Sequence, residues 1–297
     1  MKKILVTGGS GLIGRRITDL FEKEGKEVAW LSRSPEKYDQ KSFFWDPRKN
    51  ELDPEALIWC EAIIHLAGEG VADKRWTEER KKEILESRVL TTRLLFNEIK
   101  KLETKPGVFI SASAVGYYGM DTGNRLIYEG DPAGSDFLAE VVKKWESEAK
   151  QFYSLGIRVV KLRTGIVLSS DGGALVAMMK PPVAAPLGSG RQYMSWIHIA
   201  DLARMYYHAL ENAGITGIYN AVGPVPVNNK TLTRKAAKYH NKPYVNIGVP
   251  GFALKIALGE MAEMLLGGSR VSNEKIAGTG FQYLYPELNQ ALENLYR

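Results

Sequence analysis

Cysteine, histidine and long apolar runs are scarce in this sequence of 297 residues. The single cysteine, Cys60, excludes an internal disulfide and any metal site built from several thiolates, so we expect no bound metal. No stretch approaches the roughly 18 uninterrupted apolar residues of a membrane-spanning helix. The apolar run after Lys2 and Lys3 is too short for a signal-peptide core. These absences predict a globular, cytoplasmic protein without a membrane partner.

The formal net charge is +6, from 40 lysines and arginines against 34 aspartates and glutamates. Such an excess fits either a nucleic-acid partner or a surface that attracts anionic cofactors. We favour a cofactor, because the basic residues alternate with glutamates, as in residues 78–83, and no basic-aromatic interleaving occurs. We therefore expect a small-molecule substrate and no nucleic acid, and the sequence leaves a monomer and a homodimer open.

A glycine-rich turn lies near the start of the chain, between a predicted strand (3–6) and a predicted helix that begins near Leu12 and ends before Gly25. Glycines allow the backbone to approach a ligand closely, and the free N–H groups of the first helical turn attract negative charge. This arrangement predicts a dinucleotide pyrophosphate site made by Gly8, Ser10, Gly11, Leu12, Ile13 and Gly14.

The second predicted strand (27–31) ends in Ser32 and Arg33. An acidic residue at this position binds the ribose 2′-hydroxyl of NAD, whereas an arginine accommodates a 2′-phosphate. We therefore expect NADP(H) as the cofactor, with Ser32 and Arg33 at its phosphate. The alternative is that Arg33 is only an exposed loop residue.

Further strands are predicted at 62–66, 107–111 and 158–162, with long helices at 77–102 and 136–152. This alternation predicts an α/β fold with a Rossmann-type, doubly wound parallel sheet. We expect the cofactor domain to span residues 1–170, with segments 196–199 and 217–220 returning to its sheet. Residues 171–297 should form mostly a smaller C-terminal substrate-binding lobe.

Two less regular segments complete the prediction. Residues 34–60 read as a polar loop interrupted by a short apolar strand near 43–45. Residues 252–266 are rich in Leu, Met and Ala and could form a membrane-surface or partner helix. We favour a helix packed on the lobe's own core, because basic residues do not line its polar side.

The apolar strand at 62–66 is followed by the small residues Ala67 and Gly68, which leave room for a ligand at the carboxyl edge of the sheet. His65 lies inside this strand. A histidine in such a setting is more often a packed core residue than a catalytic one, and we interpret it so.

Several motifs together resemble the extended short-chain dehydrogenase/reductase superfamily of sugar-nucleotide epimerases and dehydratases. They are Thr7-Gly8-x-x-Gly11-x-x-Gly14, residues 65–68, residues 163–168 and the W-I-H-I-A-D-L-A segment at 196–203. Residues 75–77, 114–119 and 136–138 narrow the resemblance to an atypical branch of epimerase-family proteins, that of short-chain reductase family 39U. It covers essentially the whole chain and implies further cofactor contacts from Leu66, Ala67, Gly68, Glu83, Arg88 and Val167.

The chain departs from that superfamily at the residues that carry its chemistry. The family uses a tyrosine and a lysine four residues later on one helix, plus a serine, for proton transfer. Ser113 matches the serine, but the helix has Phe137 or Leu138 and Val141 or Val142 at the other two positions.

Three side chains could substitute for the missing pair. The phenols of Tyr117 and Tyr118 follow Ser113 closely, although they could equally be aromatic packing at a turn. Arg88 lies where relatives usually have an asparagine, and could replace the lysine's charge but not act as a base.

Two functions follow from these motifs. The first is an NADP(H)-dependent oxidoreductase or epimerase of an unidentified small molecule, with Ser113 and Tyr117 or Tyr118 as catalytic residues. The second is a regulatory protein that binds NADP(H) without turnover. The missing tyrosine and lysine favour the second, whereas the serine and the full substrate lobe favour the first. We favour the enzyme.

Overall fold

The computed structural model describes all 297 residues, Met1–Arg297. Eight strands form the main sheet, in the order β12-β8-β6-β5-β1-β2-β3-β4. All neighbours pair in parallel except β3 and β4. The predicted doubly wound parallel sheet is therefore confirmed. Its strands are β1 (Lys3–Thr7), β2 (Glu27–Ser32), β3 (Ser42–Asp46), β4 (Glu51–Leu52), β5 (Ala62–His65), β6 (Val108–Ala114), β8 (Arg158–Thr164) and β12 (Gly217–Ala221).

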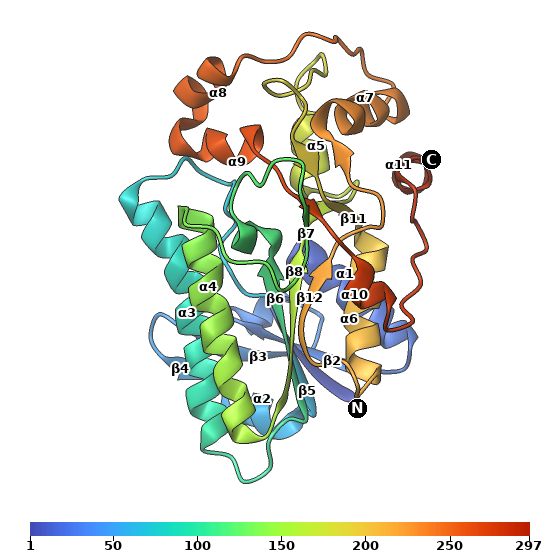
Figure 1. Ribbon diagram of the computed structural model, residues 1–297. Helices are drawn as coiled ribbons and strands as arrows, with labels where there is room; N and C mark the ends of the chain where they lie inside the picture. Colours follow the sequence, from blue (N-terminus) through green and yellow to red (C-terminus); the bar gives the residue numbers. More distant parts are fainter.

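Helices cover both faces of this sheet (Figure 1). On one face α1 (Leu12–Lys23) packs against α6 (Ile199–Glu211), and on the other α3 (Glu78–Lys100) packs against α4 (Phe137–Lys150). Successive side chains of a strand point to opposite faces, so Ile4 and Val6 join the core under α1, whereas Leu5 joins the core under α3. Because helices cover both faces of the sheet, the central strands are apolar on both sides.

Side chains fix where the long helices begin. Thr77 caps α3 by accepting a hydrogen bond from the Arg80 amide, at 3.1 Å. Asp136 caps α4 by accepting one from the Ala139 amide, at 3.0 Å. Each cap pairs an otherwise free N–H of the first turn, so these two helix starts agree with the sequence prediction within a residue.

Residues 34–60 hold more structure than the predicted loop with one strand. They form η1 (Pro35–Lys37), β3, β4 and α2 (Pro54–Trp59). Asp53 caps α2 and Pro54 occupies its first turn, which is a sequence signal for a helix start. The helix has only six residues, too few to show a periodic pattern.

One of the two predicted returns to the sheet is wrong. Residues 217–221 add β12 beside β8, as expected. Residues 196–198 instead form β11 (Trp196–His198), which pairs in parallel with β9 (Ile166–Leu168) in a separate two-stranded sheet. The main sheet has no place for β11 there, because β6 and β12 already occupy both edges of β8.

The C-terminal lobe lies beyond the carboxyl ends of the strands (Figure 1) and has its own core around Trp196 and Leu232. It contains α5 (Gly173–Met178), β10 (Tyr193–Met194), β13 (Val227–Asn228), α7 (Asn229–Tyr239) and α11 (Leu288–Tyr296). Shorter elements are η2 (Val115–Tyr118), β7 (Leu126–Ile127), η3 (Gln151–Leu155), β14 (Arg270–Val271) and α10 (Glu274–Ala277). No helix is both long and apolar enough to cross a membrane.

The helix predicted at 252–266 is broken into α8 (Gly251–Leu258), η4 (Gly259–Met261) and α9 (Ala262–Leu266). The break falls at Gly259, which has a left-handed φ of 63°. None of the α8 residues is buried, and Phe252 and Ile256 are 70% and 73% exposed. The expectation that this segment packs on the lobe's own core is therefore wrong. Met261, in its second half, is buried, but against Trp76, Ile84 of α3 and Val141 of α4.

His65 is fully buried, in agreement with its interpretation as a core residue. Its Nδ1 lies 2.9 Å from Thr7 Oγ1 and its Nε2 lies 3.0 Å from Thr92 Oγ1. Burial, aided by the charge of Arg88, lowers the pKa of His65 to about 3. The folded protein thus holds this imidazole neutral at all moderate pH values.

This burial predicts an acid-sensitive contribution to stability. Below the ordinary pKa of 6.5 the unfolded chain binds a proton at His65 that the folded chain does not take up until about pH 3. Stability should therefore fall with decreasing pH across this window, by up to about 1.4 kcal/mol per pH unit. Urea unfolding across the window should give a shallower pH dependence for His65→Gln than for wild type. His240→Gln, at an exposed position, is the control; an unchanged slope in His65→Gln would contradict the assignment.

Candidate nucleotide site

The glycine turn connects β1 to α1 as the sequence predicts. Gly8 has a left-handed φ of 68°, and its carbonyl accepts a hydrogen bond from the Gly11 amide at 3.1 Å. Gly11 precedes the helix without a capping side chain. The amides of Leu12 and Ile13 make no hydrogen bond within the chain. The start of α1 therefore offers free N–H donors and a partial positive charge.

Gly11 and Gly14 meet different surroundings. A Cβ on Gly14 would lie 2.3 Å from the Gly8 carbonyl oxygen and 2.6 Å from Gly9 Cα. A Cβ on Gly11 would meet only the Gly8 oxygen, at 3.2 Å. Gly14 thus allows the helix to pack against the turn, whereas Gly11 leaves the outer side of the turn open, as a bound diphosphate requires.

The Thr7 hydroxyl joins this turn to the end of β5. Its Oγ1 accepts hydrogen bonds from the amides of Leu66 and Ala67, each at 3.0 Å. Because two amides occupy its lone pairs, its proton is directed at His65. Thr7 thus holds the two predicted cofactor loops together, a role that no local pattern in the sequence indicates.

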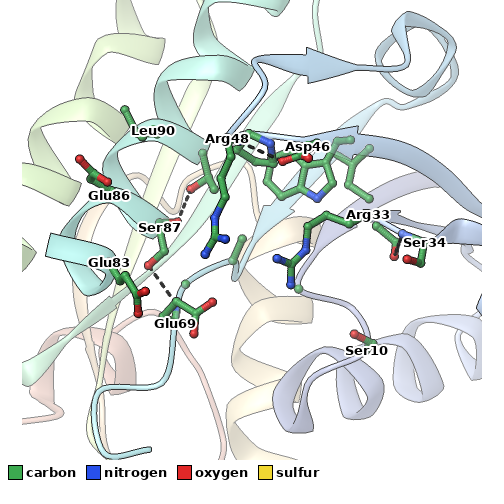
Figure 2. A pocket seen from close by; sticks show the side chains of 18 of the residues that line it. Ser10, Arg33, Ser34, Asp46, Arg48, Glu69, Glu83, Glu86, Ser87 and Leu90 are labelled. Carbon is green, nitrogen blue, oxygen red and sulfur yellow. Dashed lines mark hydrogen bonds between the residues drawn. The ribbon is translucent and has the colours of Figure 1, made fainter. Parts of the chain in front are cut away.

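A cavity of about 660 Å³ opens at the carboxyl ends of β1, β2, β3 and β5 and along the first half of α3 (Figure 2). It brings together seven of the predicted cofactor residues, namely Gly8, Ser10, Ser32, Arg33, Ala67, Gly68 and Glu83. The other seven lie outside its lining, namely Gly11, Leu12, Ile13, Gly14, Leu66, Arg88 and Val167. Val167 is on β9, paired with Ile197, away from the described cavity.

The cavity also has lining residues that sequence reasoning missed. They are Leu31, Ser34, Lys37, Tyr38, Trp45, Asp46, Pro47, Arg48, Glu69, Glu86, Ser87, Leu90 and Thr91. Most come from the segment 34–48, where no motif indicates a ligand, or from α3, where the resemblance implies contacts from Glu83 and Arg88 alone. The available signal was the position of residues 45–48, directly at the end of a parallel strand beside β2.

The two walls of the cavity differ in charge: the three basic side chains lie on one wall together with Asp46, and three glutamates line the other. Arg33, Lys37 and Arg48 come from the β2 and β3 side, and Figure 2 shows Glu83 and Glu86 on the α3 side. Glu69 and Glu83 both pair with the buried Arg80, at 3.2 and 2.8 Å. Arg33 and Arg48 make no ion pair. The basic wall is therefore free to attract an anion.

Arg88 lies next to this cavity rather than in its wall. Its guanidinium carbon is 3.0 Å from where a Cβ on Gly68 would be, and it packs over the Trp145 ring at 5.2 Å. The guanidinium donates to the Ile84 carbonyl at 2.9 Å and has no carboxylate partner. Burial lowers the pKa of Arg88 to about 10, so the group stays charged at neutral pH.

Ser113, the first predicted catalytic residue, belongs to a buried polar network. Its hydroxyl donates to Glu146 Oε1 at 2.6 Å. The guanidinium of Arg163 donates two hydrogen bonds to the same carboxylate, from Nε at 2.8 Å and from Nη2 at 2.9 Å. The proton of Ser113 is thereby directed away from the carboxyl edge of the sheet and toward α4, so its oxygen can only accept a further hydrogen bond.

The two tyrosines of η2 differ in what their hydroxyls do. Tyr118 is buried, donates to Asn220 Oδ1 at 2.7 Å and accepts from Arg163 Nη1 at 3.0 Å. Burial raises its pKa to about 12. Tyr117 is half-buried with its ring 3.4 Å from the Arg163 guanidinium carbon, and its hydroxyl makes no hydrogen bond within the chain. Their catalytic roles remain predictions.

Apolar packing fills the helix positions where the resemblance would put a tyrosine and a lysine. Val141 and Val142 are buried, and Phe137 packs edge-on against Trp76 with ring centroids 5.0 Å apart. Met261 from the C-terminal lobe joins the same cluster. No proton donor or acceptor side chain takes the place of that pair on α4.

The parallel sheet and the glycine turn at its carboxyl edge define a Rossmann-type α/β protein. Comparison with known proteins gives the family. Residues 4–136 match the NAD dependent epimerase/dehydratase family, and residues 249–295 match a domain of unknown function, DUF1731. The chain belongs to the NAD dependent epimerase/dehydratase family, since relatives of that kind are similar over its whole length.

Two relatives are the epimerase family proteins YfhF of Bacillus subtilis and SSP1921 of Staphylococcus saprophyticus. They are 35% and 37% identical, over 98% and 99% of this chain and 97% and 99% of theirs. The human epimerase family protein SDR39U1, crystallised with NADPH, is 33% identical with a TM-score of 0.89, and the alignment covers 99% of each chain. A nucleoside-diphosphate sugar epimerase of Corynebacterium glutamicum is 31% identical with a TM-score of 0.80, over 99% of this chain and 58% of that one.

The two glycines of the turn are predicted to respond differently to the same added methyl group. Gly11→Ala should keep nearly wild-type thermal stability, because one contact at 3.2 Å can relax, but should weaken dinucleotide binding at least about tenfold by obstructing the diphosphate. Gly14→Ala should lower thermal stability, because its Cβ meets backbone atoms at 2.3 and 2.6 Å. Thermal unfolding with and without NADPH checks both, and full NADPH stabilisation of Gly11→Ala would count against the site.

Proposed function

We propose that the protein binds NADP(H) and uses it in the oxidoreduction or epimerisation of a small molecule. The observation that carries the proposal is the cavity in which the glycine turn meets Arg33, at a strand end where NAD-binding proteins have an acidic residue. The human relative crystallised with NADPH supports it. The bound dinucleotide would supply hydride donation or acceptance at its nicotinamide.

The residues present fit such a cofactor. The free amides of Leu12 and Ile13 suit a diphosphate, and Arg33 with Ser32 suits a ribose 2′-phosphate. Arg88 lies beside Gly68 without a carboxylate partner, so it would hold the ribose hydroxyls or a substrate anion in place of the missing lysine. It would do so as a fixed charge and not as a base.

Among the three predicted catalytic residues, Tyr117 is the best candidate for a proton donor. The protons of Ser113 and Tyr118 are already directed to Glu146 and Asn220. The Tyr117 hydroxyl has no partner, and the Arg163 guanidinium beneath its ring fixes the orientation of the side chain. Ser113 would orient a substrate hydroxyl by accepting its hydrogen bond.

A second candidate function is a regulatory protein that binds NADP(H) without turnover. The observation that favours it is the apolar packing of Phe137, Val141 and Val142 on α4, where the family's proton-transfer pair would be. Ser113, Tyr117 and Tyr118 do not line the cavity. We favour the enzyme, because the Tyr117 hydroxyl has no partner within the chain and the Arg88 guanidinium lies beside Gly68.

Arg33 should determine the choice of cofactor. Wild-type protein should bind NADPH more tightly than NADH, and Arg33→Ala should lose about 1.5–3 kcal/mol of NADPH binding with little effect on NADH, because only NADPH carries the 2′-phosphate. Isothermal titration of both cofactors measures this. Equal wild-type affinities would remove the basis for an NADP(H) site.

Tyr117 and Tyr118 should respond differently to loss of the hydroxyl. Tyr117→Phe should lower turnover about a hundredfold with cofactor affinity and stability nearly intact, as expected for a lost general acid. Tyr118→Phe should cost about 1–3 kcal/mol of stability, because it leaves Asn220 and Arg163 short of a partner. Nicotinamide absorbance, with a carbonyl or sugar-nucleotide substrate found by library screening, measures turnover. Tight NADPH binding with no turnover of any library member would favour the regulatory candidate.

A further inference from the structure

The turn between β3 and β4 holds an arginine at a defined position. The two strands pair antiparallel, with Trp45 opposite Leu52 and Asp46 opposite Glu51. Asp46 Oδ1 accepts a hydrogen bond from the Arg48 amide at 3.1 Å, and the Asp46 carbonyl accepts one from the Lys49 amide at 3.1 Å. Asn50 closes the turn with a left-handed φ of 58°. The backbone at Arg48 is therefore anchored to the end of β3.

Arg48 and Arg33 approach the cavity from neighbouring strand ends. β2 and β3 pair in parallel, with Ser32 opposite Phe44, so the residues after each strand lie side by side. Both arginines line the cavity, and Figure 2 shows both side chains reaching into it, Arg33 from the end of β2 and Arg48 from the β3–β4 turn. Two positive groups that share a space repel one another, and an anion held between them removes that repulsion.

No acidic side chain forms an ion pair with Arg33 or Arg48, although the charge of Arg48 contributes to lowering the pKa of Glu83. Glu69 and Glu83 pair with Arg80, and Glu86 lies on α3 within 3.8 Å of Lys82. Asp46 is the acidic residue nearest in sequence, and one of its oxygens is held by the Arg48 amide. Guanidinium groups bind phosphate through paired N–H donors, and a phosphate monoester has enough oxygens to accept from two of them.

We propose that Arg48 is a second specificity residue, which together with Arg33 forms a two-arginine site for the 2′-phosphate of NADP(H). The proposal rests on the proposed function and extends it to a residue from a different strand end. The β3-β4 turn then acts in cofactor selection, because it positions one of the two guanidinium groups.

The test is a set of titrations on the full-length protein with NADPH, NADH, adenosine 2′,5′-bisphosphate and ADP. Arg48→Ala should weaken NADPH and the 2′,5′-bisphosphate about tenfold, and should leave NADH and ADP within about twofold. Arg48→Lys should restore this only partly, because an ammonium cannot form paired hydrogen bonds. Lys49→Ala removes the same charge from the next residue of the turn, which does not line the cavity, and should change none of the four affinities.

The outcomes separate this proposal from the proposed function. If Arg48→Ala weakens NADPH and NADH equally, or behaves like Lys49→Ala, the assignment of Arg48 is wrong while the NADP(H) function stands. If wild type binds neither dinucleotide, or prefers NADH, the proposed function itself fails. Thermal unfolding of each variant verifies folding. Because Arg48 is exposed at a turn, its replacement should leave the melting temperature unchanged.

Discussion

The close packing of α1 against the glycine turn is the constraint on which the nucleotide site depends. Gly14 faces the Gly8 carbonyl and the Gly9 backbone at distances that no side chain could occupy. This contact sets the start of α1 directly over the end of β1, so that its first amides face outward without partners. Thr7 then joins the turn to the residues after β5. The shape of the site is thus a property of the backbone more than of any charged side chain.

Because the backbone shapes the nucleotide site, the parts of the site that local sequence patterns encode could be predicted. The strand-turn-helix unit at residues 3–23 could be predicted, because the glycine spacing and apolar periodicity that indicate it lie within those residues. Arg33 could be predicted for the same reason, since it follows directly from the end of a strand. The misplaced β11 and the broken 252–266 helix have another cause. Strand order depends on which edge is already occupied, and a helix end at Gly259 depends on its backbone conformation.

The polar network around Arg163 lay beyond prediction for a different physical reason. Its members come from β6, η2, α4, β8 and β12, and the hydrogen bond between Tyr118 and Asn220 spans 102 residues of sequence. Single-sequence patterns contain no information on such pairings. Arg48 was missed similarly, because its relevance follows from β3 pairing with β2 in register. Neither residue differs in sequence context from an ordinary surface or core arginine.

Cofactor recognition and proton transfer therefore depend on different elements of the fold. The residues for one can change without changing the residues for the other. Cofactor recognition depends on the turn, the free amides and the strand ends, all of which this chain has. Proton transfer in the family depends on two side chains of one helix, and these can be replaced without moving the backbone. Here the two positions hold Phe137 or Leu138 and Val141 or Val142, and these apolar side chains let α4 pack against Trp76 and Met261. The carboxylate of Glu146, paired with Arg163, accepts the hydrogen bond of Ser113. The proposed chemistry therefore rests on groups outside α4, namely the Tyr117 hydroxyl of η2 as proton donor and the Arg88 guanidinium of α3 as a fixed charge.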